Sequence, residues 1–460
     1  MGSPGVRTTF AFETTLWEDL HGHLDSTTES AGVILARTAT TDKALTFLGR
    51  SIAWVPDDSY TRREPYRLEI KSTGYVPALA AAAAHRCIPV FFHTHPGGSP
   101  SPSELDDAVD DQLRALFQRR ARTEFYVSLI LGGSASEPRF SGRVYKANGP
   151  STLPIDRIRI IGQRLDILQS NPDTGSSMVQ YDRQIRAFGK QGQSVLNALH
   201  VGIVGAGATG SAVFEQLVRL GVGQLTVMDD DIVETTNLSR LHEAALADLG
   251  RTKVDVLAAR AEAIRPGIEV NAVSSRLRTE AACRELVDCD LVFGCTDDAY
   301  GRSVLSRFSY WYLAPVIDMG FVIDVRHSTV HGLFGRVTVL EPGTACLLCR
   351  GRLSPQEIAL EAMSQEERSL RASEGYAPGL GQPDPSVVAY TTLIASQAVS
   401  EMLARLFRIG DAPPAELILR VADRRISRNS REGKPGHYCV DQGRWALGDE
   451  EPMLGQLWPS

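Results

Sequence analysis

Apolar and polar positions along the first 148 residues indicate a mixture of strands and helices. The segments SAGVILART, CIPVFFHTH and EFYVSLILGG are short apolar runs, which are typical of buried strands. The segments PALAAAAAH and SELDDAVDDQLRALFQRR have the apolar spacing of helices, and the second opens with a helix-start signal. The run ANGPSTLPI indicates the end of this unit. The pattern therefore predicts an α+β domain over residues 1–150.

A more regular pattern begins near residue 180. Strand-like HVGIVGAG, QLTVMD and DLVFGCT alternate with helix-like TGSAVFEQLVRLG and RTKVDVLAARAEAI. This alternation predicts an α/β domain with a parallel, doubly wound sheet. The polar run QSNPDTGSSM suits a linker, which we place at 151–178. The second domain is expected over 179–446, followed by a tail at 447–460.

Composition narrows the class of protein. With 460 residues, 43% of them hydrophobic and 22% charged, the chain is expected to be globular and to hold more than one core. The net charge of -7 gives no general attraction to nucleic acid or anionic membranes. No apolar run approaches the ~20 residues that span a bilayer, and the first residues lack a signal-peptide pattern. A cytoplasmic location is therefore expected.

Seven cysteines are spread thinly over the chain, which argues against a disulfide framework. Only Cys346 and Cys349, in GTACLLCRG, have the spacing of metal ligands. The surroundings of the other thiols before them predict packed, inert side chains, namely Cys87, Cys283, Cys289 and Cys295.

The segment FFHTHPGGSPSPSELDD holds a candidate metal site. His93 and His95 alternate on a strand and therefore face the same side, while Ser103 and Asp106 share one face of the following helix. Two imidazoles and a carboxylate leave a fourth tetrahedral position open, as in catalytic zinc sites. The same S-x-x-D pattern is also a helix capping box, and histidines at a strand end are often only solvated. The segment alone leaves both interpretations open.

The full spacing resembles the JAMM motif of the JAB/MPN metalloprotease family over roughly the first 145 residues. His93-x-His95, seven residues, Ser103, two residues and Asp106 follow that motif, and ESAGVIL supplies the early glutamate, Glu29. The resemblance implies that His93, His95 and Asp106 bind a catalytic Zn²⁺. It also implies that Ser103 stabilises the oxyanion, and that Glu29 passes a proton from the attacking water to the leaving amine.

Two further histidines, His21 and His23 in LHGHLD, precede this glutamate. We expect them to have a structural role, such as orienting the Glu29 segment, rather than to bind metal.

The segment VGIVGAGATG is a G-x-G-x-x-G pattern between a strand and a helix, with Gly205, Gly207 and Gly210. Bare backbone and a helix N-terminus suit phosphate binding. Asp229 ends the next strand, nineteen residues beyond Gly210, where an acid meets a ribose hydroxyl. By itself this pattern fits a dinucleotide enzyme as well as other nucleotide-binding proteins.

Charged residues further along favour transfer chemistry on a nucleoside triphosphate. Asp231, Asn237 and Arg240 follow in MDDDIVETTNLSR, and LGRTKVD supplies Lys253. Cations beside the phosphates serve phosphoryl or nucleotidyl transfer better than hydride transfer. Asp297, in CTDD, is a hard oxygen ligand suited to Mg²⁺. Taken singly, these residues could also be surface charges and a helix cap.

Residues 178–445 resemble the ThiF/MoeB/ubiquitin-activating superfamily. The resemblance rests on YDRQIRAFG, GAGATG, D-x-D-x-V with NLSR, G-x-x-K at 250–253, CTDD and PGTACLLC. It implies Mg²⁺ on Asp297, and a contact from Arg183 to the triphosphate, made across the interface in homodimeric members. It implies that ATP is bound by Gly205, Gly207, Gly210, Asp229, Asp231, Asn237, Arg240 and Lys253.

The same resemblance implies a structural zinc site. Cys346 and Cys349 match its first half, whereas GKPGHYCVD offers His437 and Cys439 where a C-x-x-C pair is usual. A Cys₃His set is chemically acceptable, but a spacing of one residue between two ligands is irregular.

Together these features predict a fusion of a JAB-type peptidase with an adenylyltransferase, both acting on the C-terminal glycine of a ubiquitin-like modifier. The peptidase would expose that glycine, and the second domain would convert it to an acyl-adenylate with release of pyrophosphate. The expected partners are the modifier, a conjugating enzyme and a second copy of the chain. Alternatives are activation of a ThiS-like sulfur carrier, a non-catalytic modifier-binding module and, more distantly, a nicotinamide dehydrogenase.

The segment 350–392, which follows the first zinc pair, contains no cysteine. Many members of the superfamily use a cysteine there to take the modifier as a thioester. The sequence therefore predicts that the enzyme forms the adenylate but no stable thioester on itself.

Overall fold

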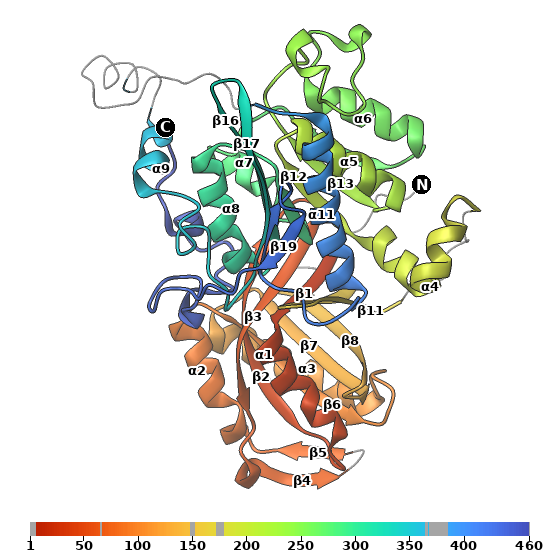
Figure 1. Ribbon diagram of the computed structural model, residues 1–460. Helices are drawn as coiled ribbons and strands as arrows, with labels where there is room; N and C mark the ends of the chain where they lie inside the picture. The colour runs from red at the N-terminus through yellow and green to blue at the C-terminus, as the bar shows by residue number, and fades with distance from the viewer. Residues whose placement is uncertain are drawn as a thin grey trace. The chain divides into compact units, whose positions relative to one another are not determined.

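The computed structural model describes residues 6–64, 67–147, 152–171, 179–363, 367 and 385–459. The chain divides into two compact units (Figure 1). The first comprises Met1–Pro172 and Ala446–Asp449, and the second comprises Asp173–Trp445 and Glu450–Ser460. The predicted fold class is confirmed.

The described part of the first unit is built on a nine-stranded sheet with the strand order β11-β10-β1-β3-β2-β6-β7-β8-β9. A separate hairpin pairs β4 with β5. The elements are β1 (Arg7–Glu13), α1 (Thr14–Gly22), β2 (Ala31–Thr40), β3 (Ala44–Trp54), β4 (Tyr60–Glu64), β5 (Arg67–Ile70), α2 (Val76–Ala84), β6 (Ile88–Pro96), α3 (Glu104–Ala121), β7 (Phe125–Ser134), β8 (Glu137–Lys146), β9 (Leu153–Pro154), β10 (Arg157–Ile161) and β11 (Leu165–Gln169).

Helices cover this sheet on both faces. Side chains alternate across a strand, so β2 sends Ile34 into one core, with Phe12 and Trp17 near α1. It sends Val33 into a second core, with Phe117 of α3. Because both faces of the central strands are buried, their sequences are nearly continuous apolar runs, which is why the sequence pattern located β2, β6 and β7.

Residues 153–169 form strands β9, β10 and β11, in contrast to the linker expected over 151–178. Strand β10 was not predicted because its sequence, RIRII, contains two arginines. Arg157 and Arg159 are nevertheless buried in the sheet, at 4% and 2% exposure. Residues 172–178 lie outside the described residues.

The expected tail at 447–460 is also packed. In the first unit, the backbone N–H of Asp449 donates to Thr38 O of β2; in the second unit, Met453 and Leu454 are fully buried. The apolar residues of this segment are scattered among Gly, Pro and acidic residues, so the sequence shows no periodic pattern that would predict the packing.

The described part of the second unit has an eight-stranded sheet in the order β14-β13-β12-β15-β16-β17-β18-β19. Its elements are α4 (Asp182–Ala198), β12 (His200–Val204), α5 (Ala208–Leu220), β13 (Gln224–Met228), α6 (Lys253–Ile264), β14 (Glu269–Val273), α7 (Glu280–Arg284), β15 (Leu291–Gly294), α8 (Ala299–Tyr312), β16 (Val316–Arg326), β17 (Thr329–Leu340), α9 (Pro355–Ala362), α11 (Val388–Leu406), β18 (Glu416–Arg420) and β19 (Arg425–Arg428).

Strands β14 to β16 are parallel, as predicted, and β17 to β19 continue the sheet in antiparallel fashion. Figure 1 shows α8 on one side of this sheet and α5 with α11 on the other. The chain runs from β12 outward to β14 and then returns to β15 on the other side of β12. This reversal falls between β12 and β15, and the carboxyl ends of strands at such a point are where doubly wound sheets bind their ligands.

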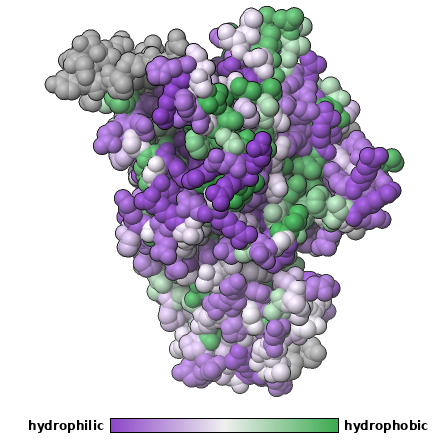
Figure 2. All heavy atoms as spheres, viewed as in Figure 1, coloured by the Kyte–Doolittle hydropathy of each residue, from purple (hydrophilic) through white to green (hydrophobic). Residues whose placement is uncertain are grey.

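The antiparallel extension leaves apolar side chains exposed. Val322 of β16 is 57% exposed and Phe334 of β17 is 44% exposed. Figure 2 shows hydrophobic patches interspersed with hydrophilic residues over the second unit. Among the described helices, none combines the length and the apolar character needed to cross a membrane.

Candidate functional site

In the first unit, the end of β6 and the start of α3 bring three potential metal ligands together. His93 and His95 lie two residues apart on β6, with Nε2 atoms 3.1 Å apart. Asp106, in the first turn of α3, places Oδ1 3.0 Å from His93 Nε2 and Oδ2 3.9 Å from His95 Nε2. One ligand atom from each residue lies within 4.8 Å of the others. Two imidazole nitrogens and a carboxylate at this separation fit the donor set of a zinc ion.

The capping interpretation of this segment is also correct. Ser103 is the N-cap of α3, and its backbone N–H and its hydroxyl both donate to Asp106 Oδ2 at 2.7 Å. Asp106 therefore uses one oxygen for the cap and turns the other toward His93. Burial alone would raise the pKa of Asp106, but hydrogen bonds and charge from His93, with the bonds from Ser103, hold it well below its usual range.

Glu29 lies beside this group, just before β2. Its Oε1 is 4.0 Å from His95 Nε2, and the residue is 5% exposed. Burial is the main cause that raises the pKa of Glu29 to about 7; the charge of His93 opposes it and Asp106 adds to it. A carboxyl group that titrates near neutral pH suits proton transfer.

The structure also bears on the roles predicted for Ser103 and for the two histidines His21 and His23. The hydroxyl of Ser103 is committed to Asp106 in this structure, so its role as an oxyanion donor stays a prediction. His21 and His23 lie outside the metal-ligand group among the described residues. His23 Nδ1 lies 3.3 Å from Ser30 Oγ, next to Glu29, and its ring stacks on Trp54.

In the second unit, the glycine-rich loop joins the carboxyl end of β12 to the N-terminus of α5. Gly205 has φ of +95°, and a Cβ there would lie 2.8 Å from the backbone of Cys295 at the end of β15. A Cβ on Gly210 would lie 1.8 Å from Gly205 O. These two glycines allow the loop to close tightly, whereas a Cβ on Gly207, at the N-terminus of α5, would meet open space.

Acidic residues and a lysine surround the end of β13. Asp229 Oδ2 accepts a bond from Ala206 N in the glycine-rich loop at 2.7 Å. The Lys253 ammonium, which is largely buried, lies 2.6 Å from Asp231 Oδ2 and 3.7 Å from Asp229 Oδ1. Burial raises the pKa of Asp229, with Lys253 opposing the shift. The structure thus brings Gly205, Asp229, Asp231 and Lys253 into one group.

Other predicted ligands lie nearby but make different contacts. Asn237 Oδ1 accepts from Glu234 N, and Arg240 donates to Thr236 O, so both side chains stabilise the turn that carries them. Asp297 is exposed after β15 and does not cap α8, because Asp298 accepts the capping bond from Gly301 N.

Arg183 is exposed in the first turn of α4, and none of the residues described in the structure forms a recorded ion pair with it. Its predicted contact with a triphosphate stays a prediction.

Sequence reasoning missed a set of arginines near the same strand ends. Arg276 pairs with Asp230 at 2.7 Å, and Arg278 pairs with Asp298 at 3.1 Å. They follow β14 in the irregular run SSRLRTE, which carries no motif. Arg302 of α8 forms two bonds to the buried Asp318 of β16, at 2.9 and 3.0 Å. Nothing in the sequence pointed to Asp318 either. An aspartate inside an apolar strand run gives no indication of which distant side chain it will bind.

The four residues of the irregular zinc pattern converge. Cys346, Cys349, His437 and Cys439 each offer a ligand atom within 4.8 Å of the others. His437 Nδ1 lies 3.5 Å from Cys346 Sγ and 3.3 Å from Cys439 Sγ, and Cys349 Sγ lies 3.8 Å from Cys439 Sγ. Hydrogen bonding with Cys439 is the main cause that lowers the pKa of Cys346 to about 5. Three sulfurs and one imidazole fit a closed structural zinc site despite the one-residue spacing.

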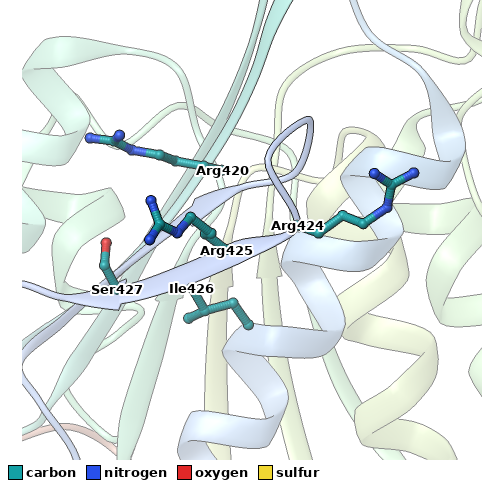
Figure 3. Close-up of a pocket in the computed structure, with 5 residues that line it drawn as sticks. All are labelled: Arg420, Arg424, Arg425, Ile426 and Ser427. Carbon is teal, nitrogen blue, oxygen red and sulfur yellow. The ribbon is translucent and has the colours of Figure 1, made fainter.

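A concavity of about 590 Å³ lies on the β18–β19 hairpin, and none of the predicted site residues lines it. Figure 3 shows Arg420, Arg425 and Ser427 pointing to one side of the hairpin, whereas Arg424 points away from them. Strand β19 is the last strand of its sheet.

The segment expected to lack a transfer cysteine, 350–392, lies partly outside the described residues, at 364–366 and 368–384. Cys295, near Asp297, is the thiol closest in sequence to the strand ends, and burial raises its pKa strongly. That thiol is therefore poorly suited to act as a nucleophile.

The two folds and their sites define a chain with a JAB-like unit followed by a nucleotide-binding α/β unit. The model of the ThiF family matches residues 181–436, and the model of prokaryotic homologs of the JAB domain matches residues 20–143. The chain belongs to the ThiF family and carries a JAB-type domain ahead of the ThiF domain. The predicted fusion of a JAB-type domain with a ThiF-type domain is confirmed.

Several adenylyltransferases and activating enzymes are similar to part of this chain. A molybdopterin-synthase adenylyltransferase of Salmonella typhimurium is 33% identical over 180 residues, 38% of this chain and 69% of the relative. A SAMP-activating enzyme E1 of Haloferax volcanii is 29% identical over 172 residues, 37% of this chain and 60% of the relative. A sulfur carrier protein adenylyltransferase of Thermus thermophilus is 32% identical over 170 residues, 35% of this chain and 63% of the relative.

Proposed function

We propose that the second unit is an ATP-dependent adenylyltransferase that activates the C-terminal glycine of a ubiquitin-like or sulfur-carrier protein. The main support is the group of Gly205, Asp229 and Lys253 at the carboxyl ends of β12 and β13, with Asp297 after the neighbouring β15. Names of the similar proteins, an adenylyltransferase for a sulfur carrier and an activating enzyme, support the same class of substrate.

The glycine-rich loop, Lys253 and Asp297 have distinct roles in the proposed reaction. Backbone N–H groups of the glycine-rich loop and the N-terminus of α5 bind phosphate oxygens, and Lys253 offsets the negative charge that grows on them. A glycine carboxylate oxygen attacks the α-phosphorus, the bond to the β-phosphate oxygen breaks, and pyrophosphate leaves with that electron pair. Asp297 supplies carboxylate oxygens for Mg²⁺, and Mg²⁺ when bound neutralises triphosphate charge.

We further propose that the first unit is a zinc-dependent peptidase or isopeptidase that cleaves after the same glycine. His93, His95 and Asp106 would hold the zinc ion, which supplies a Lewis acid that polarises the scissile carbonyl and acidifies water. Glu29 would take the proton from the attacking water and pass it to the leaving amine. The two activities would then act in sequence on one protein tail, with a conjugating enzyme receiving the activated modifier.

The adenylation proposal is tested by ATP–pyrophosphate exchange with a small β-grasp protein ending in glycine. We expect exchange that requires the carrier and Mg²⁺, and a loss of at least about 100-fold in Asp297→Ala. Asp423→Ala, which changes an exposed aspartate in the β18–β19 turn, is the matched control. Carrier-dependent exchange that is unchanged in Asp297→Ala would contradict the assignment of Asp297.

Sulfur transfer remains a second candidate because two of the three similar proteins are named for molybdopterin synthase and a sulfur carrier. Incubation of the chain with the carrier, ATP and a sulfide donor distinguishes the two outcomes by mass spectrometry. A carrier thiocarboxylate supports sulfur transfer, and a carrier joined to an amine in the presence of a conjugating enzyme supports conjugation.

A further inference from the structure

The candidate zinc site joins two consecutive elements, β6 and α3, which only the loop 97–103 connects. His93 and His95 belong to β6, whereas Asp106 belongs to α3, eleven residues after His95. A small rotation of α3 would move the Asp106 carboxylate away from both imidazoles. The contacts that fix α3 against the sheet therefore decide whether three ligands or two are available.

One turn beyond Asp106, a buried carboxylate ties α3 to two strands. Asp110 is 3% exposed and accepts from Tyr126 Oη of β7 at 2.8 Å. It also accepts from Arg143 Nη2 at 2.6 Å and Tyr145 Oη at 3.1 Å, both from β8. Arg143 Nη1 donates to Asp107, so a single guanidinium spans two carboxylates of the helix. We call Asp110, Tyr126, Arg143 and Tyr145 the α3 anchor.

The anchor lies on the same face of the sheet as the histidines. Arg143 is paired with Ser128 of β7, and Ser128 with Phe91 of β6. Phe91 and His93 are two residues apart and face the same side. On the helix, Asp106 and Asp110 are four residues apart and also share a face. The anchor and the ligand group are therefore successive contacts along one helix–sheet interface.

Charge makes Arg143 the central member of the anchor. The first two turns of α3 carry five acidic side chains, Glu104, Asp106, Asp107, Asp110 and Asp111. Burial of an unpaired carboxylate such as Asp110 is strongly unfavourable, and two tyrosine hydroxyls alone supply no compensating charge. Arg143 supplies that charge and, through a bidentate fork, a fixed direction as well.

We propose that Arg143 is a positioning residue for the metal site: by binding Asp107 and Asp110 it holds α3 so that the Asp106 carboxylate meets His93 and His95. The inference rests on the proposed zinc site. Removal of partners behind a metal ligand commonly costs 10- to 100-fold in metal affinity. Because Arg143 acts through the helix rather than on Asp106 itself, we expect a loss of about 10-fold.

The test measures zinc affinity of the full-length chain by competition with a chromophoric chelator. The zinc ion of the first unit should bind to Arg143→Gln with about 10-fold lower affinity than to the wild-type protein. Arg139→Gln is the matched control, since Arg139 is on the same strand but its side chain is 64% exposed and pairs with the exposed Glu137. The same Arg143→Gln change in a His95→Ala background should leave the remaining zinc, at the cysteine cluster, unaffected.

Several outcomes separate the possibilities. If the wild-type protein and His95→Ala hold the same amount of zinc, the metal site itself is wrong. If His95→Ala loses zinc but folded Arg143→Gln binds it within twofold of the wild-type affinity, the positioning role is wrong. A residue that only stabilised the fold would lower the melting temperature without changing the zinc affinity of the folded protein. If Arg143→Gln does not fold, Tyr145→Phe is measured instead. Because this change removes one donor to Asp110, we expect about threefold lower zinc affinity. An unchanged zinc affinity in Tyr145→Phe would overturn the proposal.

Discussion

At the scale of single residues, Asp106 carries two functions with its two oxygens. Oδ2 accepts the bonds from the N-cap Ser103, and Oδ1 faces His93. The cap and the metal-ligand group thus share one side chain, which explains why the sequence pattern supported both interpretations. The cap also orients Asp106 before any metal binds, which reduces the entropy that a ligand must lose.

The residues around this group should separate metal binding from proton transfer. His95→Ala should lose one zinc equivalent per chain and all cleavage, because two ligands hold zinc poorly. Glu29→Gln should keep the zinc and lose about 100- to 10,000-fold in cleavage rate, as expected for a missing general base. Metal analysis and cleavage of a modifier fusion measure the two effects. Full cleavage by either variant would contradict the assignment, and His85→Ala, a histidine outside the ligand group, is the control.

At the scale of elements, long apolar runs were predictable and irregular segments were not. The runs of β2, β6, β7, β12 and β15 are buried on both faces, so hydrophobic pattern alone located them. Strand β10 was missed because Arg157 is buried with its Nε bonded to Thr9, a long-range compensation that the sequence cannot display. The site residues followed from motif spacing. Arg143, Arg276 and Asp318 did not, because their partners lie far away in the chain.

The cysteine cluster also joins residues that lie far apart in the chain, and it leads to a prediction about stability. It joins the segments 346–349 and 437–439, which carry little regular secondary structure and therefore need a cross-link. Cys439→Ala should lose one zinc equivalent and lower the melting temperature by more than about 4 °C, a shift of roughly 1–2 kcal/mol for a domain of this size.

Cys283→Ala is the control for this prediction, because Cys283 is equally buried but lies outside the cluster. Zinc content by elemental analysis and thermal unfolding followed by circular dichroism provide the measurements. Equal zinc content in the two variants would show that the cluster is not a metal site.

At the scale of the whole molecule, two units with separate sheets and cores carry two separate sites. Each unit's strands pair within its own sheet, so changes in one site need not disturb the other. The exposed Arg183 on α4 remains available for a partner copy. The family resemblance predicts a homodimer in which Arg183 completes the ATP site of the other subunit.

Mixing experiments test that arrangement. Arg183→Ala and Asp297→Ala should each impair pyrophosphate exchange, and an equimolar mixture should recover up to about one quarter of wild-type activity. Recovery is expected because random exchange of subunits places one intact Arg183 opposite one intact Asp297 in mixed dimers. No recovery, with subunit exchange demonstrated by tagged copies, would indicate that Arg183 acts within its own chain.

The central claim is that both units act on the same terminal glycine, and one reaction tests it directly. The chain is incubated with ATP, labelled pyrophosphate and a modifier whose terminal glycine is blocked by a peptide-linked protein. The wild-type protein should support exchange with both the blocked and the free modifier, whereas Glu29→Gln should support it only with the free modifier. Equal exchange by Glu29→Gln with the blocked modifier, or no exchange by the wild-type protein with either form, would contradict the account.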